Sequence, residues 1–84
     1  MAGKAYVQVI DSNNESGVNI PQGLYGIEFV VETGFEKLKY VLRKISNPSE
    51  YMFVSKERAN KLARNSAIDI SSKFNCGVEA RLKD

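Results

Sequence analysis

The sequence predicts an α+β fold, with a small, mainly antiparallel sheet of four or five strands and one main helix, at about residues 55–74, packed on one face. Three observations predict this arrangement. Residues 55–74 carry small and apolar side chains at helical spacing, residues 24–33 alternate like a half-buried strand, and residues 77–83 alternate again. We expect the 84 residues to form one domain, 1–84.

The first strand is predicted at residues 5–11. Its side chains divide into two partly apolar sets, Ala5, Val7 and Val9 against Tyr6, Gln8 and Ile10. Two such faces are typical of a strand inside a sheet. Residues 12–22 are polar and contain several turn formers, so they predict a loop, which Val18 and Ile20 would pin to the body.

The second strand is predicted at residues 24–33. One face would be buried and would carry Tyr25, Ile27, Phe29 and Val31. The other face would be mostly solvated and would carry Glu28, Val30 and Glu32. Gly26 indicates a bulge or a close approach of another segment.

Residues 34–46 fit two structures. In a helix, Thr33 and Glu36 would form a capping box, and one face would hold Phe35, Leu38, Leu42 and Ile45. In a hairpin, residues 37–45 would pair back on residues 24–33 through a turn at residues 33–36. We favour the hairpin, because the neighbouring segments are rich in strand signals and the connections are short.

The helix at residues 55–74 begins and ends with recognisable signals. Ser55 is an N-cap, Glu57 places a carboxylate in the first turn, and Asn75 and Gly77 suit a helix end. One stripe would face the sheet: Ala59, Leu62, Ala63, Ser66, Ala67, Ile70 and Phe74. The outer side would stay in water: Lys56, Asn60, Lys61, Arg64, Asn65, Asp69 and Lys73.

Two short segments flank this helix. Residues 51–54 are apolar and lead into the N-cap, and residues 78–83 predict a last strand at a sheet edge, with Val78, Ala80 and Leu82 facing inward. Together with the helix they could form a right-handed crossover that adds one parallel pair.

The composition argues against catalysis. The chain has no histidine, so a Ser-His-Asp or Cys-His site cannot be built. Cys76 is the single cysteine, and we expect it to be a small, half-buried apolar residue. Glu28 and Glu32 would lie roughly 13 Å apart along one strand, and we expect them to be ordinary solvated charges. We therefore expect no enzyme, and no catalytic, cofactor-binding or metal-binding residues.

The charge is unevenly distributed along the chain. Residues 1–36 carry one basic and five acidic side chains, whereas residues 37–84 carry eleven basic and five acidic ones. The two halves could simply complement each other within one fold. The alternative is a nucleic-acid-binding protein that uses the basic outer face of helix 55–74, with Lys56, Lys61 and Arg64. A second basic group surrounds Tyr40 and contains Lys37, Lys39, Arg43 and Lys44.

The favoured hypothesis is a small non-enzymatic binding module, a regulator or inhibitor that docks on another protein. Its candidate contact residues are the tyrosines, above all Tyr25 and Tyr40, and the loop at residues 12–22, because tyrosine gives a large contact area at a low entropic cost. A free strand edge would also allow a homodimer. One cysteine and the lack of a long apolar run predict a cytoplasmic protein without membrane association.

Overall fold

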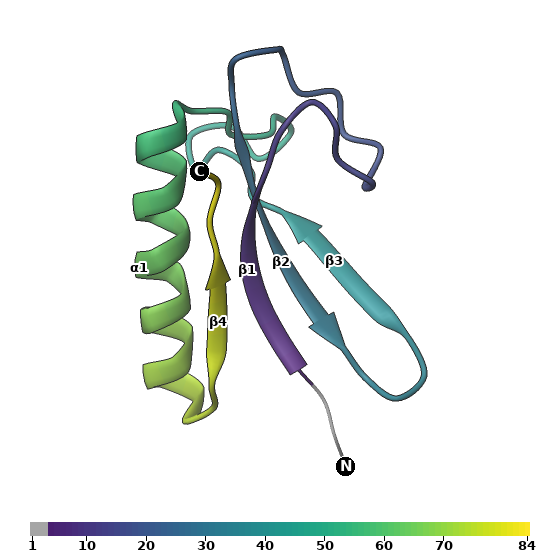
Figure 1. The fold of residues 1–84 in the computed structure, drawn as a ribbon, viewed down its shortest axis with the longest axis vertical. Helices are drawn as coiled ribbons and strands as arrows, with labels where there is room; N and C mark the ends of the chain where they lie inside the picture. The colour runs from purple at the N-terminus through teal and green to yellow at the C-terminus, as the bar shows by residue number, and fades with distance from the viewer. Residues whose placement is uncertain (1–3) are drawn as a thin grey trace.

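The computed structural model describes residues 4–84 and has one sheet with one helix packed on it (Figure 1). The elements are β1 (Lys4–Ile10), β2 (Gly26–Glu32), β3 (Lys37–Val41), α1 (Lys56–Phe74) and β4 (Val78–Arg81). The strands lie in the order β3-β2-β1-β4, and only the pair β1·β4 is parallel within this described range. The predicted α+β class is confirmed.

Strand β1 lies inside the sheet, as its two apolar faces predicted. Val7 lies opposite Phe29 of the antiparallel neighbour β2 and opposite Ala80 of the parallel neighbour β4. The parallel pair therefore joins the first and last strands. The crossover predicted between residues 51–54 and 78–83 is wrong, because residues 51–54 make only the isolated bridges Tyr25–Val54 and Arg43–Tyr51.

Residues 33–41 form the turn and the second strand of a hairpin, which confirms the favoured interpretation. The Thr33 backbone N–H donates to the Glu36 carbonyl at 2.9 Å, and the Glu36 N–H donates to the Thr33 hydroxyl at 3.0 Å. The residues that resemble a capping box thus close a turn. Pairing with β2 runs from Glu32–Lys37 to Glu28–Val41.

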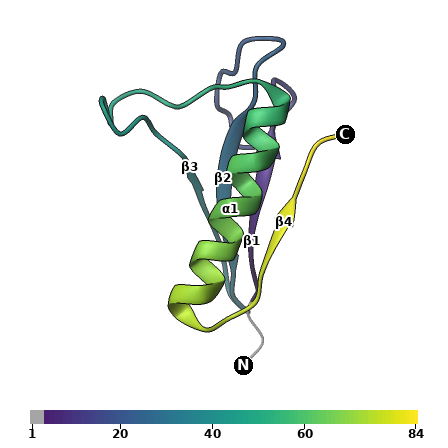
Figure 2. The same cartoon turned by 90° about the vertical axis from the view of Figure 1, so that its left-hand side faces the viewer.

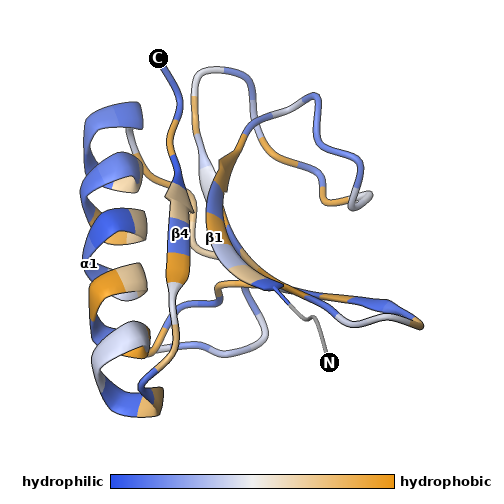
Figure 3. Ribbon diagram, turned by 60° about the horizontal axis from the view of Figure 1, so that its bottom comes forward, coloured by the Kyte–Doolittle hydropathy of each residue, from blue (hydrophilic) through white to orange (hydrophobic). Residues whose placement is uncertain are grey.

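Helix α1 has the predicted ends. The Ser55 hydroxyl accepts a bond from the Arg58 N–H at 3.4 Å, and Asn75 ends the helix in the left-handed conformation with φ 51°. Ala59, Ala63 and Ala67 are buried, and they let α1 lie close to β1 and β4 (Figure 2). Figure 3 shows that the side of α1 turned away from the sheet is mostly hydrophilic, with one hydrophobic stretch.

Three expectations for this region are wrong. Phe74 is 71% exposed, because the part of α1 that packs on the core ends at Ile70. Asn60 is half-buried rather than solvated, since its side chain donates to the Lys83 carbonyl and accepts from the Lys83 N–H. Val78 and Ala80 pack on the core as expected, but Leu82 lies beyond the end of β4 and is exposed.

The face of β1 and β2 opposite α1 is also largely buried, which corrects the prediction of a mostly solvated face. Val30 is fully buried, Glu28 is 1% exposed, and Tyr6 and Ile10 are buried beside them. The loop at residues 12–22 covers part of this face (Figure 1) and buries Ile20. A Cβ atom at Gly26 would lie 3.4 Å from the Ile20 side chain, so the close approach indicated by Gly26 is present.

No helix within residues 4–84 combines the length and the apolar character that a membrane crossing requires.

Candidate protein-docking surface

An apolar groove lies between α1 and the strand farthest from it, β3. Its volume is about 440 Å³, and we call it the α1–β3 groove. Its floor and walls are formed by Val7, Ile27, Phe29, Tyr40, Val41, Leu42, Arg43, Ser66 and Ile70.

The groove exists because one helix is too narrow to cover four strands. Helix α1 packs on β1, β4 and part of β2, and it leaves the same face of β3 open (Figure 2). On that face Leu38 is 38% exposed, Tyr40 59% and Leu42 42%. Apolar side chains therefore line a surface that no other part of residues 4–84 covers.

Strand β3 is also an open edge of the sheet. The Leu42 N–H donates to Ile27 and the Thr33 N–H donates to Glu36, so alternate residues of β3 point their backbone groups toward β2. By this alternation Lys37, Lys39 and Val41 point their N–H and C=O groups outward. These groups are available to a further strand.

Basic residues lie along β3 and directly after it, and of these Arg43 lines the groove. Lys37 pairs with Glu32 at 3.5 Å, and Lys44 pairs with Glu50 at 3.0 Å. The Arg43 guanidinium lies 4.4 Å from the centre of the Tyr51 ring. Lys39 forms no ion pair with any residue in the range 4–84. Some positive charge along β3 is therefore left without an internal partner.

The residues predicted as contacts do not form one site. Tyr40 lies in the α1–β3 groove, whereas Tyr25 is half-buried and bridges to Val54. Lys61 and Arg64 are exposed on the outer side of α1, and Lys56 is half-buried at its first turn. Two further tyrosines make contacts within the chain: Tyr6 is buried, and the Tyr51 ring stacks with the Arg43 guanidinium. The structure separates the two candidate surfaces, on opposite sides of α1.

Glu28 lies in a polar cluster on the other face of the sheet. The Gln8 amide donates to its Oε1 atom at 2.6 Å, and the Ser16 hydroxyl donates to its Oε2 atom. Ser16 belongs to the loop at residues 12–22, so the loop is fastened to the sheet through this carboxylate. The expectation that Glu28 is an ordinary solvated charge is wrong.

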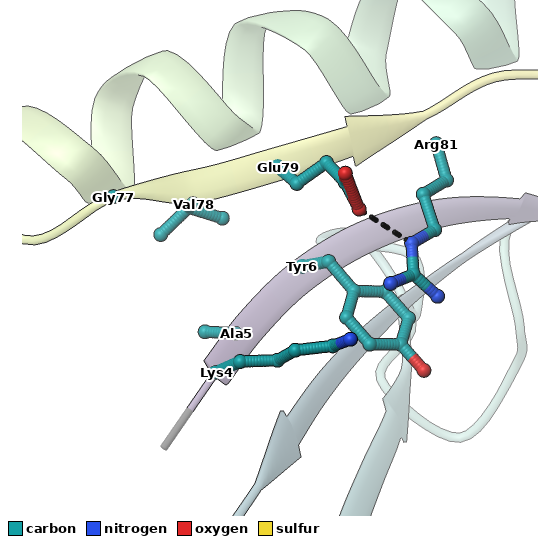
Figure 4. A pocket seen from close by; sticks show the side chains of 7 residues that line it. All are labelled: Lys4, Ala5, Tyr6, Gly77, Val78, Glu79 and Arg81. Carbon is teal, nitrogen blue, oxygen red and sulfur yellow. Dashed lines mark hydrogen bonds and ion pairs between the residues drawn. The ribbon is translucent and has the colours of Figure 1, made fainter. Parts of the chain in front are cut away.

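A hollow of about 470 Å³ beside β1 and β4 contains Tyr6 and Arg81 (Figure 4). The Tyr6 hydroxyl donates to Glu32 at 3.2 Å, and the Arg81 guanidinium lies 3.5 Å from the centre of the Tyr6 ring. Arg81 also donates to Glu79 at 2.6 Å. Tyr6, Glu79 and Arg81 therefore bind neighbouring side chains, whereas Lys4 of the same hollow forms no ion pair within residues 4–84.

These contacts lower the pKa values of two carboxylates, Glu32 and Glu79. Burial raises the pKa of Glu32, but the hydrogen bond from Tyr6 and the charges of Lys37 and Lys4 outweigh it, so the pKa lies below its ordinary value. The hydrogen bond and the charge of Arg81 likewise hold the pKa of Glu79 below its ordinary value. Both groups are stabilised as anions by neighbours within the sheet.

Cys76 is exposed directly after the helix end, which contradicts the expected half-buried position. Among residues 4–84, no three His, Cys, Asp or Glu side chains lie close enough together to hold a metal ion.

Sequence reasoning did not identify Leu42, which lines the groove, or Leu38, which lies on the same face of β3, as contact residues. Their alternation with Lys37, Lys39 and Arg43 marks one apolar face of a strand. The alternation does not say whether another element covers that face, so it predicts burial by default. Comparisons with protein-family models, with curated proteins and with solved structures find no match to this chain.

Proposed function

We propose that the chain is a small non-enzymatic binding module, a regulator or inhibitor that docks on another protein through the α1–β3 groove. The observation that carries the proposal is the exposed apolar face of β3, with Leu38, Tyr40 and Leu42 beside the groove. Contiguous apolar surface of this kind is typical of an interaction site.

The exposed apolar surface that continues from the groove to Leu38 supports a protein partner. The groove is open along β3, and its apolar residues come from a strand and a helix that hold them in fixed positions. Covering one large apolar side chain completely contributes about 1.5–3 kcal/mol. Several partly exposed side chains can therefore form the centre of an interface, with Arg43 at its rim.

The test compares two double variants in affinity capture from an extract of the source cells. Tyr40→Asp with Leu42→Asp places two charges in the groove, and Lys61→Glu with Arg64→Glu changes the outer side of α1 by the same number of residues. We expect the groove variant to lose a protein that wild type captures in a salt-tolerant manner, and the outer-face variant to retain it. Circular dichroism checks that both variants are folded. Retention of the captured protein by a folded groove variant would contradict the proposal.

Nucleic-acid binding through the outer face of α1 is the second candidate function. Lys56, Lys61 and Arg64 form no ion pair with any residue of the described chain, and the last two are exposed. Free basic groups on one helix are the footprint expected of phosphate contacts. A gel shift that weakens steeply with salt, and that disappears in Lys61→Glu with Arg64→Glu but persists in the groove variant, would favour this function.

A further inference from the structure

The side chains of β3 differ in character between the two faces of the sheet. Leu38 and Tyr40 point toward the side that carries α1, because their β2 partners Val31 and Phe29 lie on that side. Lys37 and Lys39 point to the opposite side, where Lys37 meets Glu32. A strand added to this edge would therefore meet apolar neighbours on one face and basic neighbours on the other.

The backbone of the edge is free to receive such a strand. Lys37, Lys39 and Val41 direct their N–H and C=O groups away from β2, and no strand within residues 4–84 lies beyond them. Three outward-facing residues offer up to six backbone hydrogen bonds in principle, spaced as an antiparallel or parallel ladder requires. Backbone bonds give affinity without sequence preference, so the side chains on the two faces would set the specificity.

We propose that the docking partner supplies an extended segment in which apolar and acidic residues alternate, and that this segment adds to the outer edge of β3. The apolar side chains of this segment lie beside Leu38, Tyr40 and Leu42, on the side of the sheet that carries α1. Its acidic side chains lie beside Lys37 and Lys39 on the other face. The inference rests on the proposed function, and it specifies the chemical class of the partner.

Charge complementarity selects this occupant over a second copy of the chain. Residues 37–44 contain four basic side chains and no acidic one. An antiparallel pairing of two β3 strands centred on Lys39 would place Lys39 of one copy opposite Lys39 of the other. A pairing centred on Tyr40 would place Lys37 of one copy opposite Arg43 of the other. Like charges directly opposite each other destabilise a strand pair. Lysines on an edge strand thus discourage self-association and leave the edge open to an acidic strand.

The probe is an end-blocked heptapeptide that alternates acidic and apolar residues, Asp-Val-Glu-Phe-Glu-Val-Asp, with a fluorescent label. The matched control contains the same residues with the four acidic ones grouped together, so its charge and composition are unchanged and only the alternation is lost. Fluorescence anisotropy measures binding to the full chain. We expect the alternating peptide to bind at least about tenfold more tightly than the grouped one, since only alternation satisfies both faces.

Variants of the protein locate the site. Lys39→Glu is expected to lower the affinity for the alternating peptide by about fivefold or more, because it turns one favourable cross-strand pair into a repulsive one. Lys61→Glu makes the same charge change on the outer side of α1 and is expected to leave the affinity unchanged. Lys39 is a half-buried edge residue without an ion pair in the described chain, and circular dichroism checks that Lys39→Glu is folded.

Amide hydrogen exchange distinguishes an added strand from other modes of binding. In the free chain the Lys39 and Val41 amides face away from β2 and are expected to exchange rapidly, whereas the Tyr40 amide is protected. Saturating peptide is expected to slow exchange at Lys39 and Val41 by about tenfold or more. Binding without this protection would indicate a helix seated in the groove and would overturn the inference. Equal binding of the two peptides, or a homodimer in light scattering that excludes the peptide, would overturn it as well.

The outcomes separate this inference from the proposed function. If the groove variant loses its captured protein while the alternating peptide fails to bind the wild-type chain, the docking function stands and the strand partner is wrong. If wild type captures no protein and the peptide does not bind, both are wrong.

Discussion

At the scale of single residues, Glu28 is the position where charge and burial conflict. A carboxylate that is 1% exposed is costly unless hydrogen bonds replace the water that it loses. Gln8 donates a hydrogen bond to one carboxylate oxygen, and Ser16 donates a hydrogen bond to the other. The bond from Ser16 comes from the loop at residues 12–22, so the burial of Glu28 and the position of the loop depend on each other.

Replacing Ser16 with alanine tests this dependence. The change leaves one oxygen of a buried carboxylate without its donor, and we expect the free energy of unfolding to fall by about 1–3 kcal/mol. Urea unfolding followed by circular dichroism measures the change. Ser12→Ala is the matched control, because Ser12 is exposed in the same loop, and it is expected to leave stability within about 0.5 kcal/mol of wild type. Equal effects of the two variants would mean that the Ser16 bond adds nothing to stability.

Glu32 predicts how stability depends on pH. Its pKa is lower in the folded chain than the ordinary value of 4.5, so the folded state binds a proton less readily than the unfolded state. Its contribution to stability is therefore complete above the unfolded pKa and is lost as the pH falls through the folded pKa. We expect Glu32→Gln to lose less stability than wild type between about pH 6 and about pH 3.

Glu36→Gln serves as the control for this prediction, since Glu36 is an exposed carboxylate in the same hairpin. It should keep the acid sensitivity of wild type in urea unfolding. An unchanged loss of stability in Glu32→Gln would show that the contacts with Tyr6 and Lys37 do not favour the charged form.

At the scale of secondary structure elements, local chemistry predicts most of what is observed. The Ser55 cap, the Asn75 end and the three buried alanines of α1 follow from spacing and capping preferences alone. The alternation at residues 24–33 correctly places β2, but it misjudges one of its faces. A glutamate in an alternating strand predicts a solvated side chain, and contacts with the distant residues Gln8 and Ser16 change that result. Contacts between distant segments are not contained in the periodicity of one strand.

The packing of α1 on the sheet makes Ala63 sensitive to size. Ala63 is fully buried and belongs to the core cluster with Val7 and Ile27. We expect Ala63→Leu to overpack this contact and to cost about 1–3 kcal/mol. In a domain of this size each kcal/mol lowers the melting temperature by roughly 4–8 °C.

Asn65→Leu is the matched control, because it adds the same side chain on the exposed side of the same helix. Its melting temperature should stay near that of wild type. A larger loss for Asn65→Leu than for Ala63→Leu would mean that α1 presents a different side to the sheet.

At the scale of the whole molecule, the strand order joins the two ends of the chain. Central strand β1 depends on β4 for one of its two neighbours, and β4 is the last element. The Asn60 side chain adds two hydrogen bonds to the Lys83 backbone. Neither the register of β1 with β4 nor the open face of β3 could be predicted, because both depend on which segments meet in space. Of the residues that line the α1–β3 groove, Tyr40 is therefore the one that the sequence identified as a candidate contact.

A chain that ends at Asn75 tests the role of this closure. Without β4, the parallel edge of β1 loses its hydrogen-bonding partner, and α1 loses its contacts with Val78 and Ala80. We expect the shortened chain to lose its cooperative thermal transition, since a small domain has only a narrow margin of stability. Removal of Asp84 alone is the control, because Asp84 lies outside β4 and is exposed, and it should leave the transition unchanged. A shortened chain that still melts cooperatively near the wild-type temperature would show that β2, β3 and α1 hold β1 in place without the last strand.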